Sequence, residues 1–163
     1  MSAPALKDAP AAPPRTRYED DLYTWVHEQV ALLQAGRLDE VDALNVAEEL
    51  GDVGKSEFSK IRSALEIILT HMLKWDHQPD KKTRSWANSI AVQRLEYADV
   101  LTDNPGLKSR RAEALERAYR RARLEASSET GLPVATFPPE CPYTWDDILD
   151  RPFAVDDAAR RPR

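Results

Sequence analysis

The residues of this sequence that could carry chemistry are a histidine, two adjacent glutamates, a lysine and an arginine. His71 and Lys74 lie one helical turn apart, Glu48 and Glu49 precede them, and Arg94 follows. A histidine can act as a general base, a carboxylate can accept a proton, and cationic side chains can stabilise an anion. One hypothesis is therefore a hydrolase or nuclease in which His71, Glu48 and Glu49 are catalytic and Lys74 and Arg94 hold the anion.

Arg94 stands at an unusual place in its predicted helix. Ile90 and Tyr97 belong to the apolar stripe, and helical geometry puts Gln93 and Arg94 within about 60° of the centre of that stripe. An unpaired buried charge costs several kcal/mol, so we expect a carboxylate beside the arginine. Either this pair is structural and sets the helix register, or Arg94 holds an anion in a polar pocket. The candidate carboxylates are Glu48, Glu49 and Asp39.

His71 lies about 100° from the centre of the apolar stripe of its own helix, which makes it a boundary residue. It could be a general base, a metal ligand or a hydrogen-bonded packing residue. A metal site would need Asn45, Glu48 and Glu49 on a helix that faces His71, but the Glu-x-x-His spacing of helical metal sites is missing. We therefore assign no metal ligand, and no phosphate loop or other cofactor motif is present.

The composition bounds the class of protein. The 163 residues are 42% apolar and 31% charged, which suits one globular domain. The formal charge of −5 means that the protein as a whole has no positive potential to attract nucleic acid or anionic lipid. The single cysteine, Cys141, cannot form an internal disulfide. No run reaches the roughly 18 apolar residues of a membrane span, and the first residues lack the apolar core of a signal peptide. We expect a cytoplasmic protein.

Apolar spacing of three and four residues predicts an all-α bundle of about five helices. We expect helices near 20–36, 41–54, 58–78, 85–104 and 107–126, the first capped by Asp20, the third stopped by Pro79 and the fourth capped by Ser85. A proline-rich segment after Glu129 should wrap the bundle and end in a short helix capped by Thr144. Residues 1–17 and 154–163 are interpreted as flexible tails of a single domain, 18–153.

The predicted fifth helix has a basic surface that could bind a phosphate backbone. A solvated charged face explains the same run, and no aromatic residues alternate with the arginines as stacking platforms. Nucleic-acid binding is therefore the weaker hypothesis. Its contact residues would be Arg110, Arg111, Arg117, Arg120 and Arg121.

Six blocks of the sequence resemble the bacterial domain-of-unknown-function 29 family, in order and with similar spacing. They are YEDDLYTWVHEQVALLQAGRLDEVD, NVAEELGDVGKSE, LTHMLKW, RSWANSIAVQR, DNPGLKSR and ETGLPVATFPPECPYTWDDILD, which together cover about Tyr18 to Phe153. The resemblance implies an all-helical bacterial protein without an established activity. It adds Trp86 and Tyr143 to the candidate binding residues Lys74, Gln93 and Arg94, because both match recurring positions of the family.

The sequence favours a non-enzymatic interaction protein that binds a protein partner or itself. The proline-rich segment and the basic helix are the surfaces that the sequence offers for this role. The hydrolase or nuclease remains the alternative, and it requires His71 and the glutamates to converge on one cleft.

Overall fold

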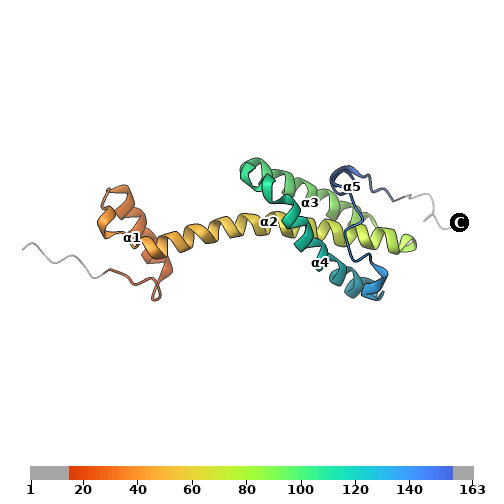
Figure 1. Cartoon of the computed structure of the whole chain (residues 1–163), viewed down its shortest axis with the longest axis horizontal. Coiled ribbons are helices and arrows are strands. Elements are labelled where there is room, and N and C mark those ends of the chain that lie inside the picture. The colour runs from red at the N-terminus through yellow and green to blue at the C-terminus, as the bar shows by residue number, and fades with distance from the viewer. Residues whose placement is uncertain (1–14, 156–163) are drawn as a thin grey trace, which may run out of the picture. The chain divides into compact units, whose positions relative to one another are not determined.

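A computed structural model describes residues 15–155 of the chain (Figure 1). Every regular element in this range is helical, which confirms the expected all-α class. The α-helices are α1 (Leu22–Gln34), α2 (Ala43–His77), α3 (Arg84–Asp103), α4 (Arg111–Thr130) and α5 (Trp145–Asp150); 3₁₀ turns lie at Leu38–Glu40, Pro79–Lys81, Pro105–Arg110 and Val134–Thr136. The chain divides into two compact units, of which the first ends at Val53 and the second begins at Gly54.

The first unit consists of α1, a 3₁₀ turn and the first turns of α2. The side chain of Asp21 caps α1 by accepting a hydrogen bond from the backbone of Thr24, one residue later than the predicted cap. Gly36 ends the helix with φ +70°, a left-handed conformation that favours glycine. The buried residues of α1 are only Trp25, Gln29 and Leu32.

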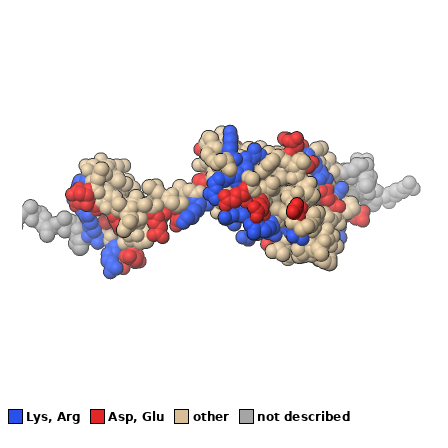
Figure 2. All heavy atoms as spheres, viewed as in Figure 1, with Lys and Arg blue, Asp and Glu red and all other residues tan. Residues whose placement is uncertain are grey.

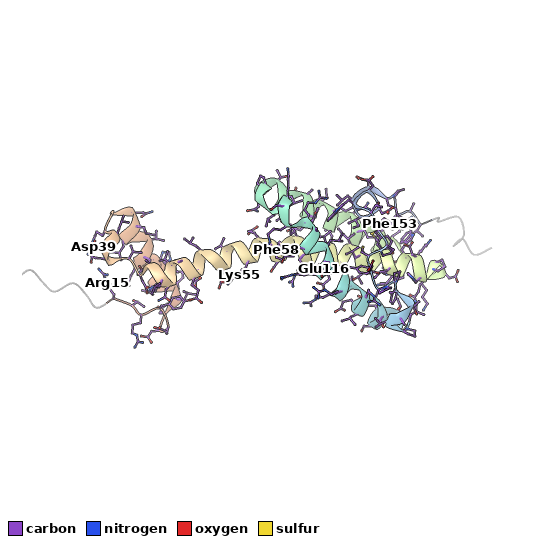
Figure 3. All side chains as sticks on the ribbon, in the orientation of Figure 1. Arg15, Asp39, Lys55, Phe58, Glu116 and Phe153 are labelled. Atoms are coloured by element: carbon purple, nitrogen blue, oxygen red, sulfur yellow. The ribbon has the colours of Figure 1, made fainter. Side chains whose placement is uncertain are left out.

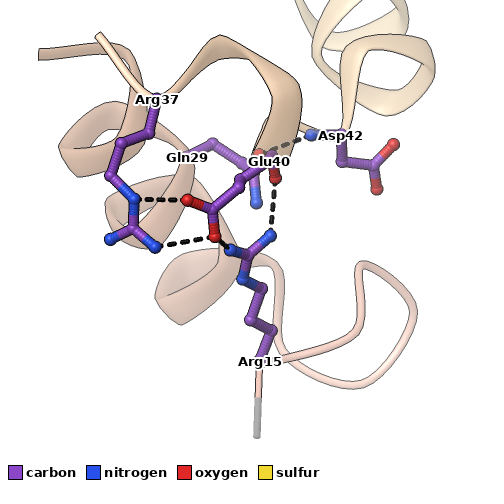
Figure 4. Close-up of polar contacts among 5 residues, drawn as sticks. All are labelled: Arg15, Gln29, Arg37, Glu40 and Asp42. Carbon is purple, nitrogen blue, oxygen red and sulfur yellow. Dashed lines mark hydrogen bonds and ion pairs between the residues drawn. The ribbon is translucent and has the colours of Figure 1, made fainter. Parts of the chain in front are cut away.

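Polar contacts hold this small unit together. Glu40 accepts hydrogen bonds from Arg15 and Arg37, and the backbone N–H of Asp42 donates to Oε1 of Gln29 at 2.8 Å (Figure 4). Thr16 donates to Glu28 through both its backbone and its hydroxyl. Residues 15–17, which the sequence places in the flexible tail, thus contribute to the unit. The rest of that predicted tail, and residues 156–163, lie outside the described residues.

The predicted helices 41–54 and 58–78 are one continuous helix, α2, of 35 residues, which begins at Ala43. The expectation of a break was wrong because it was based on Gly51 and Gly54, each of which costs only about 1 kcal/mol relative to alanine inside a helix. The predicted stop before Pro79 is confirmed, since α2 ends at His77.

The core of the second unit is built on the apolar stripe of α2. The stripe begins at Phe58 (Figure 3) and continues through Ile61, Leu65, Ile68 and Met72, all of which are buried. Side chains of the later elements pack on it, and small alanines of α4 permit a close approach. The core residues that these elements contribute are Ile90, Tyr97, Val100 and Leu101 of α3, Ala114, Ala118, Tyr119, Ala122 and Ala126 of α4, then Phe137 and Ile148.

Two helix boundaries differ from the prediction for local reasons. Thr83, not Ser85, caps α3 by accepting from the backbone N–H of Trp86 at 3.2 Å. The residues expected to begin the fifth helix form a 3₁₀ turn, so that α4 begins at Arg111 and continues to Thr130, where Gly131 ends it with φ +73°.

Within the second unit, the proline-rich segment connects α4 to the short final helix, α5. Phe137 is fully buried, and its backbone carbonyl accepts a hydrogen bond from Arg123. Thr144 and Asp147 form the predicted capping box at the start of α5, each side chain accepting from the other residue's backbone N–H. Arg123 and Tyr119 of α4 therefore bind a segment in which the only regular element before α5 is the 3₁₀ turn Val134–Thr136.

Candidate functional site

His71 and Lys74 of α2 form one cluster with Trp86 of α3. The Lys74 side chain is buried, it pairs with Glu129 of α4, and its ammonium lies 4.4 Å from the centroid of the Trp86 ring. A buried ammonium needs such partners, because the free-energy cost of removing it from water exceeds the stabilisation that one weak contact provides. The His71 ring lies 6.4 Å from the Trp86 ring.

The His71 ring is held in an apolar setting. Its Nδ1 is buried without a hydrogen-bond partner in the described part of the chain. Burial lowers the pKa of His71, and the neighbouring Lys74 charge lowers this pKa further, while Glu129 opposes the change. The imidazole is therefore neutral at pH 7, and among the described residues no carboxylate binds Nδ1 to orient the ring, as one does for most catalytic histidines.

The lowered pKa predicts a specific pH dependence of stability. The unfolded chain takes up a proton at His71 near pH 6.5, whereas the folded chain resists that proton, so stability should fall as the pH drops below about 6.5 towards the folded pKa. The slope from this residue should be a fraction of the limiting value of about 1.4 kcal/mol per pH unit. In His71→Gln this contribution should vanish. Denaturant unfolding of both proteins between pH 5 and 8 checks it, and parallel pH profiles would contradict it.

Glu48 and Glu49 do not stand on a helix that faces His71. Both glutamates and the histidine lie on α2, the glutamates in the first unit and His71 in the second. A separation of 22 residues corresponds to about six helical turns. The predicted arrangement on two facing helices was therefore wrong, and catalytic roles for these three residues stay predictions.

Glu49 has a contact of another kind within the first unit. Its Oε1 accepts a hydrogen bond of 2.6 Å from the Tyr18 hydroxyl, and this bond raises the pKa of Tyr18 to about 12. Tyr18 in turn packs edge-on against Trp25, with ring centroids 5.0 Å apart. Glu49 thus fastens the segment before α1 to α2.

Arg94 points at the end of α5. Its guanidinium donates to the backbone carbonyls of Ile148 at 2.8 Å, Arg151 at 2.9 Å and Asp147 at 3.1 Å. These carbonyls belong to the last turn of a short helix, where they lack intrahelical donors and carry partial negative charge. Three carbonyls thus take the place of the carboxylate that the sequence predicts.

Tyr143 belongs to the same anchoring region as Arg94. Its hydroxyl donates to Asp76 of α2 at 2.9 Å, and Arg151 contacts both oxygens of that carboxylate, at 2.6 and 3.0 Å. Burial raises the pKa of Asp76, but the hydrogen bonds from Arg151 and Tyr143 outweigh burial and hold it below its usual range. Sequence reasoning missed Asp76 and Arg151, since each looks like an ordinary surface charge beside a helix end.

Gln93 lies apart from both groups. It lines two open grooves between α2 and α3, of about 430 and 620 Å³, whose other lining residues include Ser63, Ile67, Ser89 and Glu96. The five candidate binding residues are therefore distributed over three places. Lys74 and Trp86 form one cluster, Arg94 and Tyr143 anchor the C-terminal segment, and Gln93 faces the grooves.

The arginines of α4, and Arg110 at the end of the turn before it, have partners within the second unit. Arg110 and Arg117 contact Glu113, Arg120 contacts Glu116, and Arg121 contacts Glu66. Figure 2 shows the two signs of charge interleaved on this part of the surface. Arg111 lies over the Trp145 ring at 4.1 Å. The positive charge available to a phosphate backbone is therefore reduced, and nucleic-acid binding through α4 stays a prediction.

Cys141 and the acidic residues offer no evident reactive centre. Burial raises the pKa of the Cys141 thiol, which disfavours the nucleophilic thiolate. Within residues 15–155, no three His, Cys, Asp or Glu side chains gather closely enough to hold a metal ion. Among the same residues, no helix is both long and apolar enough to cross a membrane.

Most of the exposed large apolar side chains of the described chain lie in the first unit. Of the thirteen large apolar side chains that are exposed, nine belong to residues 22–53. In α1 the exposed side chains occupy the face beside the buried Trp25, Gln29 and Leu32. The nine are Leu22, Tyr23, Val26, Val30, Leu33, Leu38, Leu44, Leu50 and Val53.

Comparison with known proteins agrees with the resemblance seen in the sequence. The model of the family described as Domain of unknown function DUF29 matches residues 17–154, which is most of the chain and includes both units. No curated protein and no solved structure shows significant similarity to the chain. Since this match covers most of the chain, the chain belongs to the DUF29 family.

Proposed function

We propose that the protein is an interaction module that binds a protein partner through the exposed apolar surface of its first unit. The observation that supports this proposal is the concentration of nine exposed large apolar side chains within residues 22–53. Single exposed apolar side chains are common on soluble proteins, but neighbouring ones gathered on one helix face, as on α1, are typical of binding sites.

The size of the first unit supports the same function. Its described part spans residues 15–53, and α1 buries three side chains. A unit with so small a core buries little apolar area by itself and gains stability when association covers more of it. A bound partner would supply the buried apolar area that the unit lacks.

The surfaces that the sequence offers for binding are less suitable. The proline-rich segment buries Phe137 and is bonded to Arg123, and the arginines of α4 are paired with nearby groups. Neither surface exposes as many large apolar side chains as the first unit does. We therefore place the binding surface on α1 and the start of α2.

Site-specific photo-crosslinking in cells that produce the protein tests this function. A photoreactive side chain at Val30 should give a discrete cross-linked product, and the same side chain at Val92, an exposed valine of α3, should give none. Val26→Asp in the Val30 protein should abolish the product while helix content is unchanged, because a buried unpaired charge prevents packing. Absence of any product specific to Val30 would contradict the proposal.

A further inference from the structure

We infer that the partner is a second copy of this chain, docked helix to helix through α1. This inference rests on the proposed function and names the occupant of the surface. The surface involved is the α1 seam, which we define as Tyr23, Val26, Val30 and Leu33. The exposed fractions of these residues are 76%, 37%, 43% and 45%.

The spacing of the α1 seam is that of a helix that packs against another helix. Its residues follow one another at intervals of three, four and three, the spacing of alternating a and d positions in a coiled coil. At about 100° per residue, Leu22 lies beside the seam and enlarges it. The seam is separate from the buried face that carries Trp25, Gln29 and Leu32, so α1 can pack on both sides at once.

The charge around the α1 seam favours an identical partner face. No charged residue belongs to the seam, and its neighbours on the side away from the core are His27 and Gln34. Two such faces can meet without burying an unpaired charge. A charged partner face would lose its hydration on binding the seam, which costs free energy. Four acidic side chains of the unit have partners within it: Asp21 caps α1, Glu28 binds Thr16, Glu40 binds two arginines and Glu49 binds Tyr18.

Charge also selects the direction of packing. Glu19, Asp20 and Asp21 precede α1, so two parallel helices would bring two acidic ends together. An antiparallel pair separates these ends and aligns the helix dipoles favourably. It places Val26 of one copy opposite Val30 of the other, with Tyr23 opposite Leu33. The small valines meet where the helices cross, and the larger side chains lie towards the ends.

The area of the α1 seam predicts a dimer of moderate affinity. With Leu22 included, the exposed side chains present roughly 500 Å² per copy, close to the ~600 Å² per partner of the smallest specific interfaces. We therefore expect a dissociation constant of roughly 1–100 µM. The unit carries ten acidic and three basic side chains between Arg15 and Val53, so its copies repel each other, and added salt should strengthen the dimer by screening.

Sedimentation velocity of the purified chain from about 1 to 300 µM tests the inference over the expected range. The sedimentation coefficient should rise with concentration, and the rise should be larger in about 0.5 M salt than in 0.05 M salt. Val30→Asp should weaken association at least about 30-fold, since a buried unpaired charge costs several kcal/mol. The control Val92→Asp changes a valine of α3 that is 58% exposed and should leave association unchanged.

A second measurement does not depend on how well the charged variant folds. In a Cys141→Ser background, Val26→Cys and Val30→Cys are nearly isosteric changes. A mixture of these two proteins should form mixed disulfides faster than either protein forms its own, because antiparallel packing sets position 26 against position 30. Equal rates in all three samples, or a chain that is monomeric up to about 300 µM, would overturn the inference.

The two proposals can fail separately. A photo-crosslink from Val30 with the mass of a chain dimer supports both. If the purified chain stays monomeric and Val30 cross-links to a different protein, the binding function stands and the second copy is excluded as its partner. If position 30 gives no product and the chain stays monomeric, both proposals fail.

Discussion

Replacing Arg94 with alanine should release α5 from the second unit and lower the free energy of unfolding by about 3 kcal/mol. The variant loses three hydrogen bonds from a charged donor to the carbonyls of Asp147, Ile148 and Arg151. It also loses the contact of the guanidinium with the Phe153 ring, 5.3 Å away. Each hydrogen bond from a charged group contributes about 1.5 to 3 kcal/mol, but partial solvation of Arg94 and of α5 reduces their sum.

Arg94→Lys should retain only part of this stabilisation. A lysine carries the same charge, but its ammonium is a compact donor that cannot reach three carbonyls in the way a planar guanidinium does. We expect a loss between that of the alanine variant and zero. The order of stability should therefore be arginine, lysine, alanine.

Denaturant unfolding together with hydrogen exchange of residues 145–151 measures both effects. Arg120→Ala is the matched control, because Arg120 pairs with Glu116 on the exposed face of α4 and its loss should cost less than about 1 kcal/mol. Unchanged exchange in α5 of Arg94→Ala would contradict the anchoring role. It would also restore the hypothesis that Arg94 serves a binding site.

Replacing Phe137 with alanine should lower the free energy of unfolding by about 3 to 5 kcal/mol, the largest effect that we expect from one substitution. Phe137 is fully buried in the core and packs edge-on against His77, with ring centroids 4.9 Å apart. Truncation removes the transfer free energy of the ring and leaves a cavity between the proline-rich segment and the helices. The segment should then detach, since Arg123 and Tyr119 bind it through only a few backbone carbonyls.

Leu124→Ala provides the control for this second variant. Leu124 is 59% exposed on α4, so its truncation should cost less than about 1 kcal/mol. Both variants can be compared by denaturant unfolding and by limited proteolysis between residues 130 and 145. If Phe137→Ala is as stable as Leu124→Ala, the proline-rich segment is not part of the core.

Local patterns in the sequence were sufficient for most helices. The three-four spacing of Phe58, Ile61, Leu65, Ile68 and Met72 predicts the buried face of α2, and Pro79 predicts its end. The capping box of Thr144 and Asp147 predicts α5. These signals are local because a helix is stabilised by bonds and side-chain spacing within a few residues.

The continuity of α2 could not be predicted in this way. Gly51 and Gly54 lower helix propensity, but a flanking helix on each side propagates through them at a cost of about 1 kcal/mol each. Because α2 is continuous, Glu48 and Glu49 lie on the same helix as His71 and cannot face it from a second helix. The hypothesis that His71, Glu48 and Glu49 form one site thus depended on a helix end near Gly54 that the structure does not contain.

The sequence by itself determined the all-helical class, the family and the list of candidate site residues. Only the tertiary structure decided what those residues contact, because partners far apart in sequence are chosen by packing. Arg94 binds carbonyls more than 50 residues away, and Lys74 pairs with Glu129 at a similar separation. The same holds for α1, whose apolar spacing predicts a helix but not which of its apolar residues are covered. Packing covers one of its faces and leaves the α1 seam exposed, because the first unit contains too few elements to bury both.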